Sequence, residues 1–143
     1  MIGPSCHAYL DRSPGAVDGV APAAPGELAR LRAAVTAQEW SESGFESLDP
    51  SADPAFALVE DGEVAAAANL TEFAGAPRDV GLLVHPHARG RGLGRLLGRH
   101  ATAYAVERSG LARWRALTTN GASLAIAGGL GFERYCTQLA VRA

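Results

Sequence analysis

The stretch VHPHARGRGLGRLL, residues 84–97, decides how this chain is interpreted. A hydrophobic strand is predicted to end at Val84, and after a short loop a helix begins among Gly90, Gly92 and Gly94. The first backbone N–H groups of a helix have no intrahelical partner and carry partial positive charge. Because glycines place no side chain over these groups, a phosphate can approach them closely. The stretch therefore predicts a pyrophosphate site.

Basic residues surround the same loop, and its spacing excludes the two common nucleotide folds. Arg89, Arg91 and Arg95 add full positive charge. The glycines read G-x-G-x-G, whereas dinucleotide folds use G-x-G-x-x-G inside a βαβ unit. A Walker loop needs a lysine, and all 13 basic residues of this chain are arginines. The phosphate ligand must therefore be of another kind.

The chain before this loop predicts an antiparallel meander. Asp61-Gly62 is a two-residue hairpin signal, and apolar runs lie on both sides of it. The expected strands are residues 55–60, 64–73 and 79–86. Further upstream, residues 1–26 read as an irregular segment with one strand at 7–10, followed by a helix over 26–39 and a loop over 41–54 that holds a helical turn.

The chain after the loop alternates between helix and strand. The apolar residues from Leu93 to Tyr104 follow helical spacing, and Gly110 is placed to end that helix. Asn120 can cap a short helix over 122–128. The expected strands here are residues 113–119 and 133–141. The whole pattern predicts a mixed α/β fold.

The glycine loop resembles a known family signature. Residues 89–94, RGRGLG, match the (Q/R)-x-x-G-x-(G/A) acyl-CoA signature of the GNAT N-acetyltransferase superfamily. The V-x-P pattern at 84–86 and the later segment from Asn120 to Gly131-Phe132 are also similar to that family. The resemblance covers residues 55–135. It implies one GNAT-like domain over 1–143, with a central, mostly antiparallel, splayed sheet flanked by helices.

The resemblance also implies where acetyl-CoA, the co-substrate, binds. In this family the pantetheine arm enters the gap between two splayed strands, and the pyrophosphate lies on the glycine loop. The residues implied to bind the cofactor are Leu82, Leu83, Val84, Arg89, Gly90, Arg91, Gly92, Leu93, Gly94, Arg95 and Asn120.

The implied reaction is direct attack of a primary amine on the thioester. The candidate proton acceptors are Glu72 and Asp79, near the splayed strands, and His85, with His87 beside it. Many family members carry a tyrosine acid four residues before the glycine of the GF pair, and this chain has Ala127 there. A non-catalytic CoA-binding or partner-binding domain is therefore the alternative.

Composition limits the remaining function classes. The 143 residues fit one domain, and the net charge of −2 disfavours nucleic-acid binding. Two distant cysteines, with no signal peptide and no apolar span, predict a cytoplasmic protein without a membrane segment or metal site. The alanine-rich, lysine-free composition is typical of GC-rich bacterial genomes. The acceptor, a small molecule or a peptide, stays open, as does a homodimer paired through the last strand.

Overall fold

The computed structural model describes residues 4–138. Its strands are β1 (Ser5–Leu10), β2 (Ala21–Pro22), β3 (Ala55–Glu60), β4 (Glu63–Phe73), β5 (Ala76–Val84), β6 (Ala112–Leu117) and β7 (Glu133–Gln138). Its helices are α1 (Pro25–Ala34), α2 (Ala37–Glu42), α3 (Leu93–Ser109) and α4 (Gly121–Leu130), with 3-10 turns η1 (Phe45–Ser47) and η2 (Pro86–Ala88). The described strands form one sheet in the order β2-β3-β4-β5-β6-β1-β7.

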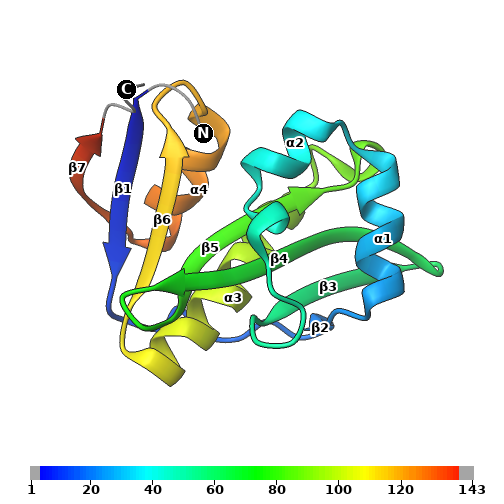
Figure 1. Cartoon of the computed structure of the whole chain (residues 1–143), viewed down its shortest axis with the longest axis horizontal. Helices are drawn as coiled ribbons and strands as arrows, with labels where there is room; N and C mark the ends of the chain where they lie inside the picture. The colour runs from blue at the N-terminus through cyan, green and yellow to red at the C-terminus, as the bar shows by residue number, and fades with distance from the viewer. Residues whose placement is uncertain (1–3, 139–143) are drawn as a thin grey trace.

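Helices cover both faces of this sheet (Figure 1). One hydrophobic cluster joins α3 and α4 to the sheet, and a second joins α1 and η1 to its other face. The alanine run of β4 belongs to both, since Ala66 and Ala68 lie in the first cluster and Ala67 in the second. This double burial explains how an alanine-rich segment of poor strand propensity forms a central strand.

The β3–β4 hairpin is confirmed. Asp61 and Gly62 both have positive φ, 50° and 78°. Two central residues with positive φ form the turn whose twist matches a two-residue hairpin. The turn fixes the antiparallel register of β3 on β4.

The predicted splay of the sheet is also present. β5 and β6 are parallel and pair only at Asp79–Arg113 and Val80–Trp114, although both strands continue further. The other strand pairs are antiparallel. The strand expected over 79–86 begins earlier, at Ala76, and ends at Val84, because Pro86 starts the turn η2.

The single helix predicted over 26–39 is wrong. The chain leaves helical geometry at Val35 and Thr36, where ψ is 166° and 159°, and α2 starts after this break. The Thr36 side chain accepts from the Glu39 N–H at 3.1 Å, and Glu39 accepts from the Thr36 N–H at 3.0 Å. This reciprocal capping box begins a new helix. The T-x-x-E spacing of residues 36–39 is its signature in the sequence.

The amino-terminal strand has a larger role than an irregular segment suggests. β1 starts two residues before the expected 7–10 and lies between β6 and β7, antiparallel to both. β7 confirms the start of the last strand, and residues 139–141 of that prediction lie outside the described residues. Within residues 4–138, no helix has the length and apolar character to cross a bilayer.

Candidate functional site

A cavity of about 840 Å³ opens where β5 leaves β6. We divide its wall into two parts. The loop end comprises the end of β5, the glycine loop and the start of α4, with Leu82, Val84, Gly92, Asn120, Ser123 and Ile126 among its residues. The α2 end comprises α2, η1 and the facing residues of β4 and β5, with Glu42, Ser43, Glu46, Asn69, Thr71 and Gly81.

The end of β5 offers an unpaired backbone edge to the loop end. Residues Leu82, Leu83 and Val84 pair with β4 on one side, while the pairing with β6 stops at Val80. All three residues line the cavity. An amide-bearing ligand can therefore extend the sheet by hydrogen bonding to this edge.

The glycine loop is shaped for close approach of an anion. Gly90 and Gly92 have φ of +80° and +79°, and a Cβ on either would meet no heavy atom within 4 Å. Both glycines line the cavity, and the 17-residue helix α3 starts directly after Gly92. The first N–H groups of α3 thus lie at an open, positively polarised surface. These features fit a pyrophosphate.

The three arginines predicted to bind the cofactor lie in different surroundings and have different partners. Arg89 and Arg95 line the cavity, where Arg95 donates to the Gly129 carbonyl at 3.3 Å. Arg91 instead forms a two-pronged ion pair with Glu60, at 2.8 and 2.9 Å, and is not part of the cavity wall. Of these three arginines, Arg89 and Arg95 are therefore on the cavity wall and Arg91 lies outside it.

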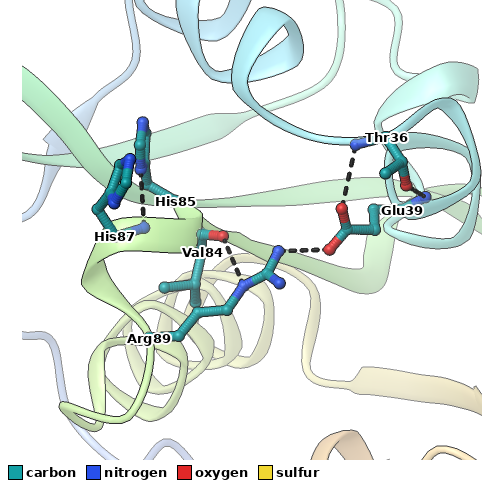
Figure 2. Close-up of polar contacts among 6 residues, drawn as sticks. All are labelled: Thr36, Glu39, Val84, His85, His87 and Arg89. Carbon is teal, nitrogen blue, oxygen red and sulfur yellow. Dashed lines mark hydrogen bonds and ion pairs between the residues drawn. The ribbon is translucent and has the colours of Figure 1, made fainter.

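Arg89 connects the two ends of the cavity. Its guanidinium forms an ion pair with Glu39 of α2, and its Nε donates to the Val84 carbonyl at 3.4 Å (Figure 2). The Thr36 N–H, and after it Arg89, hold the pKa of the Glu39 carboxyl below its usual value. Glu39 is therefore a charged partner of the arginine at neutral pH.

The predicted proton acceptors occupy three different environments. Glu72 is exposed, accepts from the Gly75 N–H at 2.9 Å in the β4–β5 turn, and is not on the cavity wall. Asp79 lines the α2 end, but both of its oxygens accept from Arg113, at 3.1 and 2.9 Å. The structure thus brings only Asp79 to the cavity, already bound to a guanidinium.

The two histidines lie outside the cavity wall. His85 accepts from the His87 N–H at 3.1 Å through Nδ1, and the two rings stack 5.3 Å apart. Figure 2 shows both rings on the other side of Val84 from the Arg89–Glu39 pair. Their contacts cap the turn η2, which positions the loop.

α4 contributes a cap and a hydroxyl. Asn120 caps the helix by accepting from the Ser123 N–H at 3.1 Å, as predicted, and it also lines the cavity. Trp114 donates through Nε1 to the Ser123 hydroxyl at 2.9 Å, which leaves the hydroxyl proton free for a ligand. Ala127 is buried in the core and carries no proton donor.

Sequence reasoning missed most of the α2 end. Glu42 ends α2 and Glu46 lies in η1, while Asn69 and Thr71 belong to β4. Asn69 had a signal, because it is a polar residue inside the buried run VAAAANL and is itself fully buried. Among residues 4–138, no three His, Cys, Asp or Glu side chains gather as a metal site requires.

A model of the acetyltransferase (GNAT) family matches residues 26–132. A GNAT-family protein from Novosphingobium aromaticivorans has a similar structure, with a TM-score of 0.79 and 20% identity over 96% of this chain and 62% of that one. A GNAT acetyltransferase from Colwellia psychrerythraea gives 0.72 and 16% over 96% and 54%. No curated protein sequence matches this chain.

A third similar structure has a bound ligand. The aminoglycoside N-acetyltransferase AAC(6′)-Iy in complex with CoA has a TM-score of 0.60 and 18% identity, over 87% of this chain and 98% of that one. The chain thus spans about three fifths and about half of the first two similar structures, and nearly the full length of the third. At these identities the similarity is one of fold.

Proposed function

Because the chain belongs to the acetyltransferase (GNAT) family, we propose that it transfers an acetyl group from acetyl-CoA to a primary amine. The observation that carries the proposal is the loop end, where an unpaired strand edge, an open glycine loop and two arginines meet in one cavity. These are the groups that an amide-bearing arm and a diphosphate need. The α2 end then receives the amine.

Each group at the loop end has a binding task. The diphosphate lies against the first N–H groups of α3, with Arg89 and Arg95 supplying charge-assisted hydrogen bonds. The amides of the pantetheine arm pair with the free edge of residues 82–84. Asn120 and Ser123 face the same arm from α4. Arg91, paired with Glu60, takes no part.

Acetyl-CoA supplies the activated acyl carbon: a C–N bond to the amine forms, the C–S bond breaks, and the proton given up by the amine ends on the departing sulfur. The protein holds the amine next to that carbon, and an N–H of the free β5 edge stabilises negative charge on the acyl oxygen. Ser123 offers a hydroxyl donor on the helix that carries Ala127. Asp79 is a carboxylate on the wall of the α2 end, held in place by Arg113.

A CoA-binding domain without catalysis is the second candidate. It is favoured by one observation, the buried alanine at position 127, where no side chain can donate a proton. General-acid catalysis typically contributes about 10²- to 10⁴-fold, so its loss alone slows a transfer to a good thiolate leaving group without abolishing it.

The two candidates differ in one measurement. The protein is incubated with acetyl-CoA and a panel of primary amines while free thiol is followed. We expect thiol release that depends on the amine and an acetylated amine in the mass spectrum. CoA binding by calorimetry without amine-dependent release supports the second candidate, and the absence of CoA binding contradicts both.

A further inference from the structure

The α2 end of the cavity is acidic, while the loop end is basic. Glu42 and Glu46 are exposed at the turn between α2 and η1, and both line the cavity. Neither forms an ion pair with any of residues 4–138, whereas Glu39 is paired with Arg89 and Asp79 with Arg113. Of the other cations on the wall, Arg95 lies at the loop end and Arg115 is on β6, across the splay from β5. Two uncompensated negative charges therefore face the amine path.

Asn69 adds a hydrogen-bond acceptor at the base of this end. Its side chain is fully buried, its Nδ2 donates to the Ser43 carbonyl at 3.4 Å, and its Oδ1 has no partner among the described residues. Burying an unsatisfied carbonyl costs free energy, so such a group calls for a donor. The 3.4 Å contact is long for a hydrogen bond and holds the carboxamide only weakly.

The position of Asn69 places that acceptor beside the point where β5 and β6 separate. Asn69 pairs with Gly81 across β4 and β5, directly after the last β5–β6 pair at Val80. A Cβ at residue 81 would lie 2.7 Å from Asn69 Oδ1 and 2.0 Å from the Ser43 carbonyl oxygen. The carboxamide, the α2–η1 turn and the point where the strands separate thus meet over one glycine.

Resting on the function proposed above, we propose that the acceptor is a polyamine-type cation, with a reacting amine and at least one further ammonium group. Asn69 Oδ1 accepts an N–H of the reacting amine beside Gly81. Glu42 and Glu46 attract the second ammonium at the rim, where their carboxylates stay hydrated. α2 and η1, which carry both carboxylates, lie over β4 and β5 (Figure 1). The cavity is then polarised, with the diphosphate at one end and the cation at the other.

The test compares three acceptors of equal chain length: 1,4-diaminobutane, 1-aminobutane and 4-aminobutanoate. With acetyl-CoA in excess, we expect kcat/KM to fall in that order, with the diamine about 10-fold above the monoamine at low salt and the gap narrowing as salt rises. In the double variant Glu42→Gln/Glu46→Gln, the ratio of diamine to monoamine falls about 10-fold. Glu63→Gln, an exposed carboxylate at the start of β4 outside the cavity wall, leaves the ratio unchanged.

The role of Asn69 is tested by comparing the effect of its substitution on the KM for amines with the effect on CoA affinity. Asn69→Ala should raise KM for all three amines about 10-fold while the CoA dissociation constant and the melting temperature stay near wild type. Asn69→Ser, which keeps a hydroxyl acceptor, should recover part of the loss. Equal changes in CoA affinity and amine KM would show a purely structural residue and overturn its role.

Calorimetry with 1,4-diaminobutane added to the CoA complex tests the cation site separately from the proposed acetyl transfer. Thiol release without preference for the diamine overturns the cation site and leaves the transferase in place. Diamine binding that depends on Glu42 and Glu46, without thiol release, overturns the transferase and supports the site. A diamine that neither binds nor reacts in preference to the monoamine rejects the cation site outright.

Discussion

The two ends of the cavity are built by different means. The loop end is built mainly from one continuous stretch of chain, from Leu82 to Arg95, with the start of α4 beside it, and it offers a ligand largely backbone groups. The α2 end is assembled from three separate segments, α2 with η1, the middle of β4 and the middle of β5, and presents side chains. Backbone recognition needs glycines at fixed spacing and therefore leaves a motif in the sequence. Side-chain recognition needs only proximity in space and leaves none.

The two ends are joined at two places. β5 passes from Gly81 at the α2 end to Val84 at the loop end, and the Arg89–Glu39 pair connects the glycine loop to α2. Substitutions on either side of these joints should separate cofactor binding from amine transfer. Each of the following experiments asks whether the ends are as independent as their construction indicates.

The largest effect is expected from Gly92→Val, which should weaken CoA binding by at least about 100-fold, or about 2.7 kcal/mol. A side chain at this position covers the first N–H groups of α3, and a β-branched residue is strained at a φ of +79°. Isothermal calorimetry with CoA measures the change.

Gly62→Val is the matched control for this variant. Gly62 has nearly the same φ, +78°, and a Cβ there also meets open space, but the residue lies in the β3–β4 turn outside the cavity. Both variants should lose about 1–2 kcal/mol of stability from backbone strain, and only Gly92→Val should lose CoA. Equal CoA affinities would mean that the loop does not hold the diphosphate.

Gly81→Ala should have the opposite profile. The added Cβ would lie 2.0 Å from the Ser43 carbonyl oxygen, so the α2–η1 turn must move. Because a shift of about 1 Å can cost about 100-fold in rate, we expect amine kcat/KM to fall about that much, with CoA affinity within about threefold of wild type. Thiol release and calorimetry on the same samples measure both quantities.

Gly26→Ala in α1 is the control for this substitution, since a Cβ there meets no atom within 4 Å. It should leave both quantities at wild-type values. If Gly81→Ala instead loses CoA and amine transfer in equal measure, the two ends are not separable and the cavity acts as one unit.

The features that could be predicted from the sequence are divided in the same way, between those that depend on neighbouring residues and those that depend on distant ones. The hairpin, the glycine loop and the Asn120 cap were predictable because each depends on local chain geometry: a turn pair, a positive φ or a side chain three residues from its partner. The splayed sheet was implied by the family resemblance. Gly92 was assigned to the site from the glycine spacing and Val84 from the resemblance to the family, and both line the cavity.

The remaining features depend on distant partners. Arg91 has the same charge as Arg89 and lies in the same loop. Glu60, 31 residues away, nevertheless pairs with Arg91 outside the cavity. Glu72 was a candidate by strand position, yet the β4–β5 turn uses its carboxylate. Two features were missed despite a local signal: the break between α1 and α2, marked by the T-x-x-E capping box at residues 36–39, and Asn69, a polar residue in a buried apolar run.

The smallest effect, and the sharpest comparison of the two ends, is expected from Glu39→Gln. Glutamine can keep the capping box of α2 but removes the charge that pairs with Arg89, which in the proposed function also binds the diphosphate. We expect CoA to bind about two- to threefold more tightly at low salt, whereas Arg89→Ala should weaken binding about 10-fold in a salt-sensitive way. Titration by calorimetry at two salt concentrations measures both changes.

The pH dependence and a control complete this test. Because the Thr36 N–H, and then Arg89, lower the pKa of Glu39, its charge persists as the pH falls through the usual glutamate range. The difference between wild type and Glu39→Gln should therefore be constant from neutral to mildly acidic pH and disappear only below that range. Glu60→Gln breaks an ion pair of the same kind, to Arg91, and should leave CoA affinity unchanged. If the Glu39 and Glu60 variants have the same CoA affinity, the Arg89–Glu39 ion pair does not couple the two ends of the cavity, and α2 has no influence on CoA binding.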